Sequence, residues 1–540
     1  MLVKQQLGIF LIMALLIGGF NAKAQFKPVD VSHSSIYEFL DEMANLQLIE
    51  LQDLTKPWPR SYIVEKLQQI EDQQSSLNQR QRAELEFYMK DYGKELHPGK
   101  DFDRRLDLFY YKDSLFTITV NPIGGLQYFL NDSAGFYHRW NGAEAWATVG
   151  DHLAVWASLR DNHETTFLSD EDYLNQRMGA NYKYTGDGGG DYSEMRGGIS
   201  YSWKWGQLGV AKDHFLWGQG YNGANIFSGH TPSFAHINMQ LKPADWFEFN
   251  WVHGWLVSEV TDTALSYTFT NAYGTDSREL FHDKFLAANM FTFRPFKNFF
   301  ISAGNSVIYS DNGPQLQYMI PVMFYKSVDH TYNATDKEAR NAGQNSQMFF
   351  SLSSRNIKHV HLYSTLFVEE LSVDRFFDDE EFNFWSLKLG SRVSDLIPNT
   401  QLTLEYTKSM PLTYQHHIPT TTFESNGYNM GHYLRDNSRE YFAALDFYPL
   451  RGLKVHLHYL WAQRGKDYDS LGGSRLGNPF LDSVEWENKT LYFRLRYQII
   501  HDGYLLFSVR HSNIIGVPDY TPEEYRGKQT TYSFGINYGF

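Results

Sequence analysis

Hydrophobic and polar positions alternate strictly along the last eleven residues of the chain, 530–540. Aromatic or aliphatic side chains occupy every second position: Tyr532, Phe534, Ile536, Tyr538 and Phe540. Successive side chains of a strand point to opposite faces, so the pattern favours a membrane-spanning strand between lipid and a polar lumen. The soluble alternative is an edge strand of a β-sandwich. An aromatic last residue also resembles the signal by which outer-membrane barrels are recognised during insertion.

The same period of two runs through the chain after about Arg105, for example in residues 455–461 and 491–497. In the second segment we expect Tyr492, Arg494 and Arg496 to face a lumen and the residues between them to face lipid. Short turn signals recur at intervals of roughly 50 residues, which is too long for one hairpin and implies a long loop at the opposite end. They fall at 150–151, 205–206, 243–245, 295–298, 355–357, 397–399, 449–452 and 502–503.

Eight short turns, with both chain ends on the same side, predict an all-β transmembrane barrel of about 18 antiparallel strands. Short turns are typical of the periplasmic side, and long polar loops are typical of the outside. We expect external loops at residues 165–196, 218–236, 261–282, 310–345, 376–384, 409–440, 465–486 and 512–529.

Residues 34–100 follow a helical period instead. Ser35 and Glu38 form a capping-box pattern, and apolar residues then recur at helical spacing from Ile36. Two further helices are expected at about 62–70 and 78–92. We therefore predict a periplasmic helical subdomain at residues 25–105 and an outer-membrane barrel with long extracellular loops at residues 106–540.

The first residues carry the pattern of a secretory signal peptide. Lys4 precedes an apolar run at residues 7–20, and Ala22-Lys23-Ala24 resembles a cleavage site. The run is short for a bilayer span, so we expect a signal peptide at residues 1–24 that is cleaved on export. No Cys follows the cleavage site, which excludes bacterial lipidation. Without another long apolar run, a membrane protein of this sequence spans the bilayer only as a barrel.

Composition agrees with this interpretation. Aromatic residues make up 16% of the chain and mean hydropathy is −0.46, which is too polar for a helical membrane protein. The chain has no cysteine, so an exported fold must rely on hydrogen-bond closure rather than disulfides. The formal charge of −14 becomes −16 without Lys4 and Lys23, which disfavours nucleic acid as a partner.

No catalytic motif, cofactor motif or Cys/His metal spacing is present, so we expect neither an enzyme nor a cofactor. Three segments weakly resemble metal-binding sites. For each of them we favour a solvated or flexible loop over a metal site. They are the glycine-rich residues 187–191, the acidic residues 378–381 and the pair His416-His417.

The most distinctive motif is Phe-Leu-Trp-Gly-Gln-Gly-Tyr at residues 215–221. An aromatic ring held between glycines can offer its face to a sugar through C–H contacts, whereas the alternative is an interfacial Trp at a strand end. We take Trp217, Gln219, Tyr221 and His230 as candidate sugar-binding residues. A second group of polar residues falls on the predicted lumen side, and we expect its opposite charges to pair across the interior while loops fill the rest: His359, His361, Glu369, Lys388, Glu405, Asp446, His456, His458, Arg494 and Arg496.

These segments resemble the Wzi family of capsule-assembly outer-membrane proteins, in a Bacteroidetes-type form. The resemblance covers about residues 36–540. It rests on residues 36–48, 56–57, 217–220, 225–228, 232–234, 304–309, 318–321, 362–363 and 368–370. It implies an 18-stranded barrel with a periplasmic helical bundle, and a lectin-like role in holding capsular polysaccharide. In Bacteroidetes, similar proteins are also associated with gliding motility and surface-adhesin machinery.

The leading hypothesis is thus a non-enzymatic outer-membrane protein that binds or organises a surface polysaccharide. Multivalency along a polymer would raise retention without a tight single site. A second hypothesis is a subunit of a gliding or secretion complex, in which residues 35–92 form the docking face. A third is a diffusion porin, and a fourth is a barrel enzyme that acts on lipid, which the missing Ser/His pairing disfavours.

Overall fold

A computed structural model of the chain describes residues 27–32, 34–96, 102–185, 189–272, 274–310, 313–333, 344–378, 380–468 and 475–539. The predicted signal peptide, the terminal Phe540 and part of the glycine-rich segment 187–191 lie outside the described residues.

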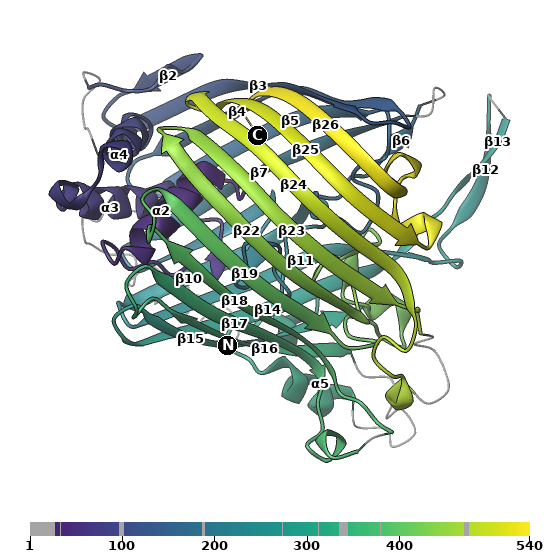
Figure 1. Cartoon of the computed structure of the whole chain (residues 1–540). Helices are drawn as coiled ribbons and strands as arrows, with labels where there is room; N and C mark the ends of the chain where they lie inside the picture. The colour runs from purple at the N-terminus through teal and green to yellow at the C-terminus, as the bar shows by residue number, and fades with distance from the viewer. Residues whose placement is uncertain are drawn as a thin grey trace, which may run out of the picture.

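Eighteen antiparallel strands form one closed barrel, as predicted (Figure 1). The ring closes where the last strand pairs with the first, with Phe534 opposite Tyr128. In ring order the strands are β3 (Phe116–Leu130), β4 (Gly135–Val149), β5 (Leu153–Glu164), β7 (Gly190–Trp203), β8 (Gly206–Asp213), β10 (Phe234–Ala244), β11 (Phe247–Thr261), β14 (Phe281–Phe296), β15 (Phe299–Tyr309), β16 (Asn345–Ser354), β17 (Val360–Glu370), β18 (Phe384–Ser394), β19 (Thr400–Ser409), β22 (Ser438–Leu450), β23 (Leu453–Gly465), β24 (Val484–Ile500), β25 (Gly503–Gly516) and β26 (Gly527–Tyr538).

The predicted alternation of apolar and polar side chains in β26 is confirmed: the two faces of the strand differ in exposure. The side chain of Phe534 is 59% exposed on the outer wall, whereas Ser533 is 2% exposed and faces the lumen. Other outward positions also expose apolar side chains, among them Leu126, Phe350, Leu352, Leu404, Leu491 and Leu505. The barrel thus presents an apolar exterior that suits a lipid surround.

All eight predicted short turns join neighbouring strands at one end of the barrel, the short-turn end. The predicted long loops connect strands at the other end, the loop end. Smaller elements lie around this frame: β2 (Phe109–Lys112) pairs beside the start of β3, β6 (Lys183–Tyr184) pairs with β7, and β20 (Glu424–Ser425) pairs with β21 (Tyr428–Asn429). The hairpin of β12 (Tyr267–Asn271) and β13 (Gly274–Arg278) projects from the loop end (Figure 1).

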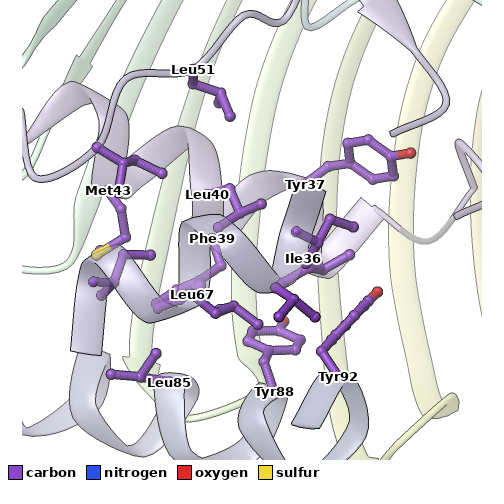
Figure 2. Close-up of a cluster of buried hydrophobic side chains, with 14 of the residues drawn as sticks. Ile36, Tyr37, Phe39, Leu40, Met43, Leu51, Leu67, Leu85, Tyr88 and Tyr92 are labelled. Carbon is purple, nitrogen blue, oxygen red and sulfur yellow. The ribbon is translucent and has the colours of Figure 1, made fainter. Parts of the chain in front are cut away.

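In the N-terminal residues that the structure describes, three helices are present where the helical period predicts them: α2 (Ser34–Asn45), α3 (Arg60–Glu71) and α4 (Gln79–Tyr92). Their apolar stripes meet in a shared core (Figure 2), because each stripe buries its side chains against the other two helices. The core includes Ile36, Phe39, Leu40, Met43, Leu67, Leu85, Tyr88 and Tyr92. Asn78 caps α4 in a capping box with Gln81.

The capping box expected at Ser35 and Glu38 is wrong, because both residues lie inside α2. The Ser35 hydroxyl lies 2.9 Å from Tyr504 Oη, and Glu38 Oε1 is 3.0 Å from Lys454 Nζ. Both partners belong to barrel strands, so these side chains tie α2 to the wall instead of capping it.

The three helices therefore form a plug at the short-turn end, with α2 against the inner wall (Figure 1). The strand β1 (Thr55–Lys56) that links α2 to α3 pairs with β9 (Leu216–Trp217) inside the barrel. The division into two domains near residue 105 stays a prediction, although the plug and the barrel interior are in contact.

Among the described residues, no helix combines the length and the apolar character that a bilayer span requires.

Candidate functional site

The predicted sugar-binding motif lies inside the barrel. Residues 214–233 connect β8 to β10 and fold into the lumen, where Trp217 pairs with Thr55 of the plug. Gly218 N donates to Leu54 O at 2.8 Å. The expectation that residues 218–236 form an external loop is therefore wrong for most of this segment, because the backbone pairs with the plug instead of reaching solvent.

Trp217 is enclosed by other aromatic rings. Its ring centroid lies 5.4 Å from that of Phe227 and 5.7 Å from that of Phe215, and its side chain is only 5% exposed. The glycines beside it serve the turn: Gly218 and Gly220 have φ of 130° and 140°, which L side chains rarely adopt. In this conformation no sugar ring can stack on Trp217.

Gln219 and Tyr221 form hydrogen bonds with the plug, and Tyr221 also forms one with strand β19 of the barrel wall. Gln219 Nε2 donates to Asp53 Oδ1 at 2.8 Å, and Tyr221 Oη donates to Asp41 Oδ1 at 2.8 Å. The Tyr221 amide donates to Glu405 Oε1 of β19 at 2.6 Å. The structure thus brings three of the four candidate residues together, where the plug and the barrel wall meet residues 214–233, which we call the inward loop.

His230 lies apart from the other three. Its carbonyl accepts from Gly179 N at 2.7 Å, and its ring packs edge-on against Tyr428 at 5.6 Å. Burial lowers the pKa of His230 to about 4, so the imidazole is neutral at physiological pH. That the four residues bind sugar stays a prediction, and their burial disfavours it.

A buried ionic cluster joins the plug to the barrel at the same junction. Arg355, in the turn between β16 and β17, donates from Nη2 to Asp41 at 2.7 Å and to Asp53 at 2.6 Å. Asp41, Asp53 and His361 place ligand-type atoms close enough to hold a metal ion. However, the Arg355 guanidinium, also 3.1 Å from His361 Nδ1, stands where such a cation would bind. Burial raises the pKa of Asp41, but the charges of Arg355 and Arg392 outweigh it and lower the pKa overall.

The lumen-side charges do pair, but the pairs join neighbouring strands, or the wall and the plug, and not opposite sides of the lumen as expected. Lys388 Nζ lies 3.1 Å from Glu405 Oε2 and Lys454 Nζ lies 3.1 Å from Asp446 Oδ1, and these four side chains are buried. Arg496 pairs with Glu38 of the plug. Paired charges of this kind fix the plug and the inward loop, whereas a water-filled pore would leave them solvated.

Two further loops complete the filling of the barrel, so the expectation that residues 165–196 and 409–440 are external is also wrong for much of both segments. Residues 410–437, between β19 and β22, carry Tyr414, whose Oη donates to Asn225 O at 2.8 Å. Residues 165–185 meet this loop where Tyr428 Oη donates to Ser169 O at 2.6 Å. The lumen is therefore occupied by the plug at the short-turn end and by packed loops above it. A cavity of about 1270 Å³ remains beside α3, at the short-turn end.

The loop end carries an exposed aromatic pair that the sequence motifs did not single out. Tyr267 and Phe269 lie on one face of the β12–β13 hairpin, 50% and 38% exposed, with ring centroids 6.1 Å apart. Arg278 and Asp276 stand opposite them on the same face. The signal available in the sequence was the alternation of Tyr267 and Phe269 with threonines inside a predicted loop.

A closed barrel with an apolar exterior and a filled interior is an outer-membrane β-barrel. No protein-family model matches the chain, and no curated protein matches it in sequence. The structure is similar to that of Wzi of Escherichia coli, described as an outer-membrane protein involved in group 1 capsule assembly and as a carbohydrate-binding β-barrel. The TM-score is 0.60 at 11% identity, over 96% of this chain and 100% of Wzi. At this identity the likeness shows the fold.

Porin structures also match. OprD of Pseudomonas aeruginosa matches with a TM-score of 0.41 at 10% identity, over 78% of this chain and 94% of its own. OccAB2 of Acinetobacter baumannii matches with a TM-score of 0.42 at 8% identity, over 78% of this chain and 97% of its own.

Proposed function

We propose that this protein binds and helps to organise a polysaccharide at the cell surface, without enzymatic chemistry. The observation that carries the proposal is the filled lumen: plug, inward loops and paired wall charges leave the loop end as the surface on which the barrel can act. The whole-chain likeness to a carbohydrate-binding barrel supports the same role. We also propose that the protein is a Bacteroidetes-type member of the Wzi family. It would be exported with a signal peptide that is cleaved after Ala24.

The β12–β13 hairpin is our candidate for the polymer contact. The rings of Tyr267 and Phe269 offer apolar faces to the C–H groups of sugars, and Arg278 and Asp276 supply hydrogen bonds to hydroxyl or carboxylate groups. A single pair of exposed rings binds weakly, so retention depends on repeated contacts along the polymer.

Retention of purified surface polysaccharide by detergent-solubilised protein tests the proposal. Wild type should retain the polymer, and the double variant Tyr267→Ala/Phe269→Ala should retain several-fold less. The control Thr268→Ala/Ser277→Ala alters only the opposite, hydroxyl-bearing face of the hairpin. No retention by wild type would overturn the proposed function. Equal retention by all three proteins would exclude only the hairpin as the site of polymer contact.

A second candidate function, docking of periplasmic gliding or secretion machinery on residues 35–92, is favoured by the cavity beside α3. Tyr62, Glu65 and Gln68 of α3 line it together with Trp205 of the β7–β8 turn. Co-purification of periplasmic proteins with wild type, lost in Tyr62→Ala/Trp205→Ala while polymer retention persists, would support this role.

A further inference from the structure

Between β15 and β16, residues 313–329 lie against the outside of the barrel. The strands beneath it alternate, so that Ile308 faces the packed lumen whereas Asn305 faces outward. Asn305 pairs across strands with Asn289 of β14, and Asn289 pairs with Trp251 of β11. These three side chains form a polar strip on the outer wall, near the middle of β14 and β15. Residues 313–329 cover this strip, and we call them the outer flap.

Hydrogen bonds seal the flap to the strip. Asn289 Nδ2 donates to Pro321 O at 2.9 Å and to Met323 O at 2.8 Å. Asn305 Oδ1 accepts from Tyr325 N at 2.9 Å, and Trp251 Nε1 donates to Tyr325 Oη at 3.0 Å. The carbonyls of Pro321 and Met323 and the amide of Tyr325 are thereby satisfied from the barrel side, as non-helical backbone at membrane depth requires.

Aromatic packing reinforces this seal. Tyr318 and Tyr325 are fully buried against Phe285, Val307 and Tyr309 of the wall. The helix α5 (Tyr325–Asn333) continues from this contact and adds Val328 to the same cluster.

The opposite side of the flap is apolar at its exposed positions up to Phe324, and Ser327 in α5 is an exposed polar residue beyond them. Between residues 313 and 324, every exposed side chain is apolar: Pro314, Leu316, Ile320, Val322 and Phe324. Single exposed apolar residues are ordinary, but a continuous apolar face over an irregular loop marks an interaction surface. The neighbouring strand β16 exposes Phe350 and Leu352 on the same outer wall, so this face extends the barrel's apolar exterior.

We propose that the outer flap is inserted into the membrane and that lipid acyl chains cover its apolar face. Continuity with the apolar wall and the hydrogen bonds that the wall makes with the flap backbone both point to lipid. The flap thus screens Trp251, Asn289 and Asn305 from acyl chains, and presents side chains that acyl chains solvate. An external loop in water would bury these apolar side chains and expose the asparagines.

Because the natural chain has no cysteine, single-cysteine variants report one position each. Val322→Cys and Phe324→Cys carry an environment-sensitive fluorophore on the flap, Phe350→Cys carries it on the lipid-facing wall, and Thr268→Cys carries it on the projecting hairpin. The proteins are reconstituted at low density in phosphatidylcholine vesicles. Each label is then exposed to spin-labelled phosphatidylcholine and to aqueous iodide.

Labels at 322 and 324 should match the label at 350, with quenching by the spin-labelled lipid severalfold stronger than at 268 and with weak quenching by iodide. Strong iodide quenching at 322 and 324, matching 268, would overturn the proposal. So would protection from both quenchers that disappears on dilution in lipid, because it would show that a second copy covers the flap. A milder variant, Leu316→Cys, gives a third position if Phe324→Cys folds poorly.

Discussion

Arg355 donates a hydrogen bond from Nη2 to Asp53 Oδ2 at 2.6 Å, which joins a turn of the barrel to the link between two plug helices. Both side chains are buried, and the same guanidinium group also binds Asp41. The pair therefore fixes the position of the plug, since neither carboxylate has access to bulk water.

Replacing Arg355 by Met should loosen the plug. Two buried carboxylates would lose their main cation, and removal of one partner of a buried ion pair costs about 3–5 kcal/mol. We expect faster hydrogen exchange in α2 and earlier protease cleavage between residues 46 and 59. The control Arg278→Met alters an exposed guanidinium on the hairpin, for which we expect wild-type protection. Unchanged exchange in α2 of the Arg355 variant would show that the cluster does not hold the plug.

Plug docking should weaken in acid because of Glu38. Burial raises the pKa of Glu38, but the charges of Arg496 and Lys454 outweigh burial and lower it to about 2 from an ordinary value of 4.5. The folded state therefore favours the charged carboxylate. Its contribution, about 3 kcal/mol, is complete above pH 4.5 and is lost as the pH falls towards 2.

Protease accessibility of α2 between pH 2 and pH 7, compared in wild type and Glu38→Gln, measures this contribution. The variant should be less stable than wild type at pH 7, and the difference should vanish near pH 2. A difference that stays constant over the whole range would assign the effect to packing instead of charge.

The filled lumen predicts an electrically silent barrel. Plug and inward loops block the path at two levels, so wild-type protein in planar bilayers should show no steady porin-like conductance. Arg355→Met should add at most brief openings, because residues 214–233 and 410–437 still fill the lumen above the plug. A stable open channel in wild type would favour the porin hypothesis.

Much of the barrel follows from its sequence because a strand between lipid and lumen must alternate. The eight short turns and β26, with Phe534 outside and Ser533 inside, follow from that constraint. The helices also follow, since their apolar stripes have a period that strands cannot satisfy.

The spacing of apolar residues does not predict whether a loop folds into the lumen or over the outer wall. Residues 214–233 and 313–329 are both turn-rich connections, yet the first enters the lumen and the second covers the outer wall. Only a weak signal separates them: the flap carries apolar residues at successive even positions, from Leu316 to Phe324. The ionic cluster could not be predicted from the sequence for another reason. Asp53 and Arg355 are about 300 residues apart, and only the closed barrel brings them together.

Trp217→Ala tests whether the motif is structural or sugar-binding. The ring is packed on all sides, so its loss should destabilise the protein by about 3–5 kcal/mol through the cavity left behind. Denaturation in detergent should show this loss, and the control Trp246→Ala, at an exposed turn position, should show far less. If Trp217→Ala keeps its stability but loses polymer retention, the motif binds sugar after all.

Gly390 is expected to be indispensable for the contact between wall and inward loop. A Cβ at this position would lie 2.1 Å from Tyr363 Cζ, since the two residues are cross-strand partners and the ring lies over the glycine. Tyr363 Oη donates to Glu405, which in turn accepts from the Tyr221 amide of the inward loop. Gly390→Ala should therefore displace the ring and disturb the loop, at about 1–3 kcal/mol.

The matched control is Gly124→Ala in β3, where the nearest atom to the added Cβ is 3.9 Å away. Denaturation of both variants in detergent, with hydrogen exchange of the Tyr221 amide as a local probe, separates the two cases. Gly390→Ala should lower stability and speed exchange at Tyr221, whereas Gly124→Ala should leave both near wild type. Equal behaviour of the two variants would mean that the Tyr363 ring moves aside at no cost, and that Glu405 holds the loop without it.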